Sequence, residues 1–158
     1  MNASATDTIS LDGPYLDIIS LRQSGLCCSQ IMVKLILNDL GRDNPELIRS
    51  VAALCFGGSQ ISGTCGVLTG AACALSLCLG SDTGREQASP DLPLLLSELA
   101  DWFTARVNSP AGGTSCAEIL SASPNKQGCS LLLIATLEKL RSMPEVAAGN
   151  AAKGSNHG

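Results

Sequence analysis

An uncharged stretch, GTCGVLTGAACALSLCLG over residues 63–80, constrains this sequence more than any other feature. Gly66, Gly70 and Ala74 recur every four residues in it, so on a helix they form one face without bulky side chains. A glycine costs a helix roughly 1 kcal/mol relative to alanine, so two of them favour a face that another element approaches closely. We therefore predict a buried central helix that presents a thiol, Cys65, in its first turn.

The composition favours packed helices. Hydrophobic residues make up 45% of the 158 residues, yet aromatic residues make up only 3%, so the core is built from aliphatic side chains and cysteine. The formal net charge is −4 and Lys and Arg do not cluster, which argues against nucleic acid as a partner. We predict an all-α fold, a compact multi-helix bundle around the buried, small-residue-rich central helix.

Helix start and stop signals place the other elements. We predict a short helix from Pro14, a helix over 26–40 capped by Ser24, a helix over 45–55, the central helix capped by Thr64, a helix over 94–107, a short helix at Cys116 with a Ser115/Glu118 capping box, and a last helix to about Ser142. As domains, we predict a flexible N-terminus over 1–12, a single helical redox domain over 13–143 and a disordered tail over 144–158.

The apolar part of the central stretch, residues 67–79, is shorter than the ~20 residues that a membrane-spanning helix needs, so we predict no membrane span. The first residues, MNASATDTISLDG, carry no basic segment followed by an apolar one, as an export signal would. We therefore expect a cytoplasmic protein. Its eight cysteines should then be reduced thiols that bind metal or take part in redox chemistry, rather than structural disulfides.

Four cysteines share one local context: Cys28, Cys65, Cys116 and Cys129 each lie in or near the first turn of a predicted helix. A helix N-terminus stabilises negative charge by about 0.3–1 kcal/mol and can lower the pKa of a thiol. If the four helix starts converge, they form an electropositive pocket lined by sulfur. A [2Fe–2S] cluster held by four thiolates would suit such a pocket.

The remaining cysteines fit that pocket less well. Cys73 and Cys78 lie about 12 and 20 Å along the helix from Cys65, so we interpret them as packing residues. Cys55 and Cys27 could pack or support the site, and only one of Cys27 and Cys28 can face a given centre because they are ~100° apart on a helix. No zinc, haem or ferredoxin cysteine spacing occurs, and the single histidine, His157, lies in the predicted tail.

The segments GLCCSQIM, GTCGVLTGAACALSL, SCAEIL and GCSLLL occur in an order and spacing that resemble the C-GCAxxG-C-C family of redox-active proteins. The resemblance spans most of residues 25–140. Its best stretch, residues 65–70, is similar to the family's C-G-A-x-x-G, with Val67 where alanine is usual. It implies a small helical protein with an iron–sulfur centre that works beside oxidoreductases.

From these observations we expect an iron–sulfur protein, with [2Fe–2S] held by Cys28, Cys65, Cys116 and Cys129, that exchanges electrons with a partner oxidoreductase. Such a protein is an electron carrier or accessory protein rather than a stand-alone enzyme. Cys27, Cys55, Gly66 and Gly70 could support the site. Two alternatives stay open: a cluster-free thiol/disulfide or thiol-transfer protein, and a helical domain with structural zinc. The small-residue face could serve a homodimer as easily as a contact within the chain.

Overall fold

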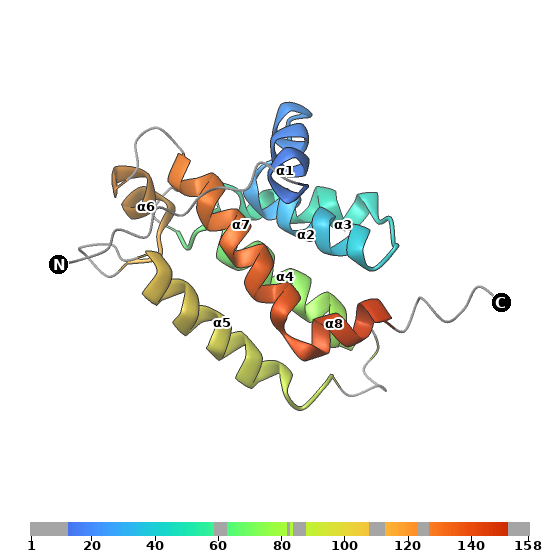
Figure 1. Ribbon diagram of the computed structural model, residues 1–158. Helices are drawn as coiled ribbons and strands as arrows, with labels where there is room; N and C mark the ends of the chain where they lie inside the picture. The colour runs from blue at the N-terminus through green and yellow to red at the C-terminus, as the bar shows by residue number, and fades with distance from the viewer. Residues whose placement is uncertain are drawn as a thin grey trace.

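The computed structural model describes residues 13–58, 63–81, 83, 88–107, 113–122 and 127–151. These residues confirm the all-α prediction (Figure 1), because their only β-type pairing is one isolated bridge between Thr64 and Ser115. The elements are α1 (Pro14–Gln23), α2 (Cys28–Asp39), α3 (Pro45–Ser50), the 3-10 helix η1 (Val51–Leu54), α4 (Gly66–Leu79), α5 (Leu92–Val107), α6 (Cys116–Ala122), α7 (Gln127–Ser142) and α8 (Pro144–Ala151). Among the described residues, no helix is long and apolar enough to cross a membrane.

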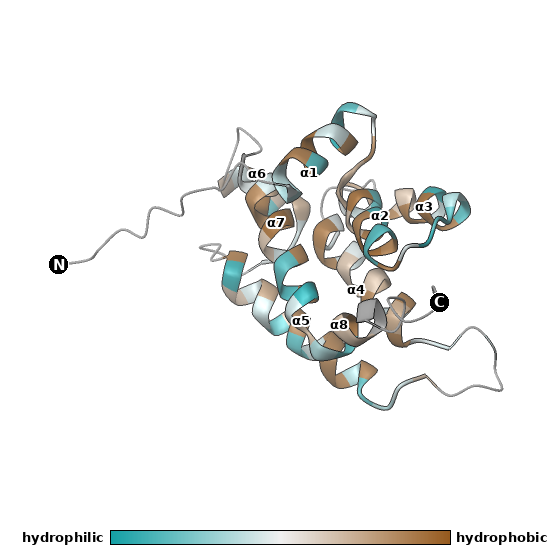
Figure 2. Ribbon diagram, turned by 45° about the vertical axis from the view of Figure 1, so that its right-hand side comes forward, coloured by the Kyte–Doolittle hydropathy of each residue, from teal (hydrophilic) through white to brown (hydrophobic). Residues whose placement is uncertain are grey.

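Helix α4 is the central element, as predicted, and it contacts α2, η1, α5, α7 and α8. In Figure 2 hydrophobic colour occurs on α2 and α4 and on the helices packed around them. A Cβ added at Gly70 would lie 2.7 Å from Ser29 Cα and 2.9 Å from Ser29 O, which is closer than side chains approach a backbone. The small-residue face of α4 is thus filled by α2 of the same chain and is not available for a homodimer contact.

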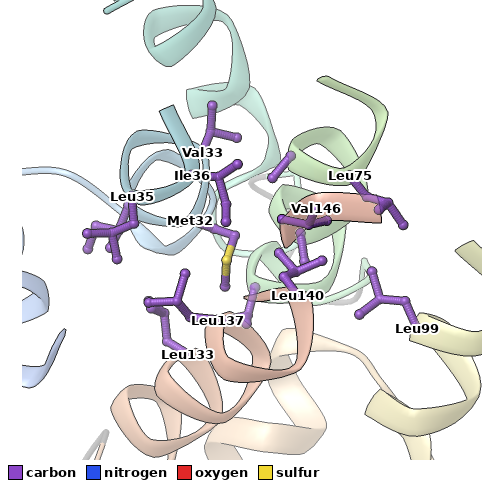
Figure 3. Packing of buried hydrophobic residues seen from close by; sticks show 14 of the residues in the cluster. Met32, Val33, Leu35, Ile36, Leu75, Leu99, Leu133, Leu137, Leu140 and Val146 are labelled. Carbon is purple, nitrogen blue, oxygen red and sulfur yellow. The ribbon is translucent and has the colours of Figure 1, made fainter. Parts of the chain in front are cut away.

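The core surrounds this helix pair. Met32 of α2 points toward Leu137 of α7, and Leu75 of α4 and Leu99 of α5 close the core from the other side (Figure 3). All four side chains are fully buried. Burial of such side chains provides about 1.5–3 kcal/mol each, so this core fixes the relative positions of the four helices.

Two predicted N-caps are wrong. Ser24 ends α1 instead of beginning α2, and its hydroxyl donates to the carbonyl of Leu21 at 2.7 Å. The N-cap of α2 is Cys27, and the N-cap of α4 is Cys65 rather than Thr64. Thr64 instead pairs with Ser115, and this tertiary contact moves the start of α4 along by one residue.

Three other boundaries differ from the prediction, and one of them is the start of α5, which begins at Leu92 rather than at residue 94. The helix expected over 45–55 is α-helical only to Ser50 and tightens into η1, which ends at Leu54. Within the segment 144–158, expected as a disordered tail, the structure forms α8 over Pro144–Ala151, and Val146 is fully buried in the core. Residues 152–158 and the predicted flexible segment 1–12 lie outside the described residues.

Candidate functional site: a cavity lined by cysteines

The four cysteines singled out in the sequence line one cavity of about 200 Å³. Its walls are formed by Arg22, Leu26, Cys27, Cys28, Phe56, Cys65, Val67, Cys116, Ile119, Leu120 and Cys129. Positions far apart in the sequence thus meet at one place, as their shared helix-start context predicted. Apart from the sulfurs and Arg22, the described side chains of the lining are apolar, and no carboxylate is among them.

The starts of two helices are held side by side by the backbone. Cys65 N donates to Thr114 O at 2.8 Å, and Cys116 N donates to Gly63 O at 3.1 Å. These reciprocal bonds are those of a short antiparallel pairing, here outside any strand. They place the first residue of α6 against the N-cap of α4, so Cys65 and Cys116 are brought together by main-chain hydrogen bonds.

The predicted capping box fixes the start of α6. Glu118 accepts hydrogen bonds from Ser115 N at 3.1 Å and from Ser115 Oγ at 2.6 Å, and Ser115 Oγ accepts from Glu118 N at 3.3 Å. The side-chain and then the backbone hydrogen bond from Ser115 lower the pKa of Glu118. Glu118 is therefore a capping residue whose function is to orient the helix that carries Cys116.

A glycine allows Cys28 to lie against the start of α4. A Cβ added at Gly66 would lie 2.8 Å from Cys28 Sγ and 3.0 Å from Leu54 O. The absence of a side chain at this position therefore lets α2, η1 and α4 meet at the cavity. Gly66 thus allows close packing against Cys28 and η1, and Gly70 allows close packing against Ser29.

Burial controls the protonation of the thiols. Cys65 is 5% exposed, and desolvation raises its pKa from 9.0 to about 12. The backbone N–H groups of Val67 and Leu68 lower this pKa, although the Cys65 side chain makes no capping hydrogen bond to α4. Negative charge on Cys28 or Cys116 would raise the pKa of Cys65 further. The expectation that helix starts lower the thiol pKa is wrong for Cys65, because desolvation outweighs the helix N-terminus.

Cys116 behaves in the same way. Burial raises the pKa of its thiol, and charge on Cys28 and on Cys129 raises it further. Charge on neighbouring sulfurs therefore adds to the effect of burial at both Cys65 and Cys116, and the two effects together oppose ionisation of these thiols.

A disulfide joins Cys27 to Cys55, with 6.0 Å between their Cα atoms, so the prediction that all the cysteines are reduced is wrong for this pair. The other six cysteines are thiols. The chain turns sharply after Cys55 through Phe56, Gly57 and Gly58, with φ values of 54°, 66° and 74°. The Gly-Gly pair was the sequence signal for this turn, since such φ values favour glycine.

Cys73 and Cys78 lie away from the cavity lining and pack against the core, as interpreted from the sequence. Burial raises the pKa of both thiols. They are therefore packing residues and serve as useful reference cysteines for experiments on the cavity.

Within the described residues, no group of three or more His, Cys, Asp or Glu side chains is placed so that it could hold a metal ion. His157 lies outside the described residues. The described residues therefore do not form a preassembled site for a metal ion.

Residues 26–143 match the model of a family described as putative redox-active proteins, C-GCAxxG-C-C. The matched range begins at Leu26, one residue before the first cysteine of the cavity lining, and ends after α7, so it contains all five cysteines that line the cavity. Comparison with curated proteins and with solved structures gave no match.

Proposed function

Since this chain belongs to the C-GCAxxG-C-C family of putative redox-active proteins, we propose that it is an electron-transfer protein whose cavity holds a [2Fe–2S] cluster. The proposed ligands are Cys28, Cys65, Cys116 and Cys129. The observation that carries the proposal is that these four cysteines, from four helices, line one cavity.

The chemistry of the lining supports an iron–sulfur centre. Thiolates are the ligands that such clusters use, and the described lining of the cavity offers four cysteines for this role without a competing carboxylate. A cluster with four thiolates is an anion, and Arg22 at the cavity supplies a positive charge. When bound, the cluster supplies one-electron redox chemistry, while the protein supplies the sulfur ligands, the apolar walls and the charge that set its potential.

The protonation of the thiols sets a condition for loading. Cys65 and Cys116 must each lose a proton before they can act as ligands, and burial opposes this loss. We therefore expect incorporation to improve as the pH rises above neutral. The same raised pKa disfavours the cluster-free alternative at these two cysteines, because the thiolate is the reactive form in thiol exchange.

The redox partner of this electron carrier is proposed to be an oxidoreductase. The exposed side chain of Phe56 lies at the cavity, 55% accessible to solvent. An exposed aromatic residue next to a redox centre is suited to contact a partner protein. Phe56→Ser should therefore weaken electron exchange with the partner without changing the iron content.

The test is to purify the full chain without oxygen, reconstitute it with iron and sulfide, and measure iron, acid-labile sulfide and visible absorbance. We expect two irons and two sulfides per chain. Cys65→Ser should lose the cluster, whereas Cys73→Ser, outside the cavity, should keep it. Colourless protein without iron would refute the proposal, and stoichiometric zinc in its place would favour the structural-zinc alternative.

A further inference from the structure

The Cys27–Cys55 disulfide contacts a buried hydroxyl group. Ser29 is fully buried, and its Oγ lies 3.4 Å from Cys27 Sγ and 3.2 Å from Cys55 Sγ. The same hydroxyl donates to the backbone carbonyl of Val51 at 2.8 Å. Both sulfurs of the disulfide are thus within hydrogen-bonding distance of one oxygen atom.

The hydrogen-bonding capacity of this hydroxyl is better satisfied when the pair is reduced. A serine hydroxyl has one donor hydrogen and two acceptor lone pairs. Its hydrogen goes to Val51 O, so both lone pairs are left for the sulfurs. Disulfide sulfurs carry no hydrogen and cannot donate to Ser29 Oγ, whereas the two thiols of a reduced pair can. A buried acceptor without a donor is unfavourable, so this site favours the dithiol.

We propose that Cys27 and Cys55 form a second redox centre, a reversible dithiol/disulfide pair, and that Ser29 is a positioning residue whose hydroxyl stabilises the reduced form. This centre uses none of the four proposed cluster ligands and goes beyond the proposed electron-transfer function. It also reconciles a disulfide with the expected cytoplasmic location, where disulfides are mostly transient catalytic or redox-sensing pairs.

The natural reductant class is a dithiol, and the structure indicates the direction of attack. Cys27 lines the cavity and is partly exposed, whereas Cys55 is only 8% exposed. A thiolate of the reductant attacks Cys27 Sγ, the Cys27–Cys55 bond breaks, and Cys55 leaves as a thiolate toward which the Ser29 hydroxyl can rotate.

The second thiol of the reductant then attacks its own sulfur in the mixed disulfide and releases Cys27. Each released cysteine takes up one proton. Overall, the protein disulfide gains two electrons and two protons, and the reductant becomes a disulfide. In the product, both thiols can donate to Ser29 Oγ while its hydrogen returns to Val51 O.

The test is a redox titration of the full chain under native conditions. The protein is equilibrated in mixtures of reduced and oxidised dithiothreitol, quenched with acid, alkylated in denaturant and mapped by mass spectrometry. We expect Cys27 and Cys55 to change together as a two-electron couple, in both directions, while the circular dichroism spectrum stays helical. A pair that is reduced only when the protein unfolds is purely structural, and this result would overturn the proposal.

Ser29→Ala provides the second half of the test. Removing the acceptor should shift the equilibrium roughly tenfold toward the disulfide, which lowers the midpoint potential by about 30 mV. Ser50→Ala is the matched control, since Ser50 Oγ also donates to a backbone carbonyl, that of Leu47 at 2.8 Å, but has no sulfur partner in the described residues. An unchanged midpoint in Ser29→Ala would refute the role of Ser29. If that variant does not fold, reversible titration of the wild-type pair still decides whether the centre exists.

Discussion

Replacement of Gly70 by alanine tests the packing that positions the cavity. Alanine is the better helix former, so helix propensity alone predicts that Gly70→Ala stabilises the protein by roughly 1 kcal/mol. The structure predicts the opposite sign. The new Cβ would lie 2.7 Å from Ser29 Cα, whereas ordinary contacts begin at 3.4 Å. Helices α2 and α4 would have to separate by about 0.7 Å in a core packed as densely as an organic crystal.

The magnitude follows from the kind of atoms involved. Overpacking a core costs typically 1–3 kcal/mol. The atoms nearest to the new Cβ, Ser29 Cα and O, belong to the backbone of a helix and cannot move aside as the end of a side chain can. We therefore expect a cost of about 3 kcal/mol, offset by about 1 kcal/mol of helix propensity. The net result is a destabilisation of about 2 kcal/mol.

The assay is urea unfolding, followed by circular dichroism and by the fluorescence of Trp102, with the disulfide in the same redox state in all variants. Ala72→Gly is the matched control, because Ala72 lies on a partly exposed position of the same helix. It should cost about 1 kcal/mol from propensity alone. If Gly70→Ala is instead stabilising by a similar amount, the close approach of α2 and α4 is wrong.

Three further predictions concern charge. Burial raises the pKa of Cys65 from 9.0 to about 12, so the folded protein holds this proton at pH values where the unfolded chain has lost it. The free energy of unfolding should therefore fall by about 1.4 kcal/mol per pH unit between pH 9 and 12, and Cys65→Ala should remove this slope in urea unfolding measured against pH. Because the pKa of Glu118 is lowered in the folded state, its carboxylate stabilises the fold at pH values above the ordinary pKa of 4.5, and this contribution is lost as the pH falls below 4.5. In Glu118→Gln the melting temperature should therefore fall less steeply with decreasing pH than in wild type. Arg141→Lys should lower the free energy of unfolding in urea by about 1 kcal/mol, because Arg141 Nε and Nη2 both donate to the Asp39 carboxylate, at 2.7 and 2.8 Å. Lys34→Ala is the control: it removes the exposed ion pair with Asp43 and should stay within about 0.5 kcal/mol of wild type.

The helices were predictable from the sequence, but their first residues were not. Serine and threonine are the preferred N-caps, so Ser24 and Thr64 were the expected choices. Two other contacts decide the outcome. Thr64 pairs with Ser115 across the chain, and Cys27 N donates locally to Gln30 Oε1 at 3.2 Å. A local propensity of about 1 kcal/mol is easily outweighed by such contacts.

Helix α8 shows the same limit at the other end of the chain. Proline and glutamate at positions 144 and 145 are a helix start signal, but the segment ends in the polar run KGSNHG, which favoured disorder. Val146 and Met143 decide the outcome, because they are 1% and 3% exposed against the core. Val146 is buried because α8 packs against α4 and α7, and the sequence around residue 146 does not indicate this packing.

The cavity cysteines were predictable because four independent helix starts carried the same residue, whereas no sequence pattern paired Cys27 with Cys55. Cys27 and Cys28 are adjacent at the start of α2, but their side chains have different neighbours. Cys28 lies against Gly66 near the other cavity thiols, whereas Cys27 is bonded to Cys55. Cys55 directly follows η1, which packs against α2 and accepts a hydrogen bond from the Ser29 hydroxyl at Val51 O. The two proposed centres would therefore be adjacent at the start of α2, because Cys27 of the disulfide precedes the proposed cluster ligand Cys28.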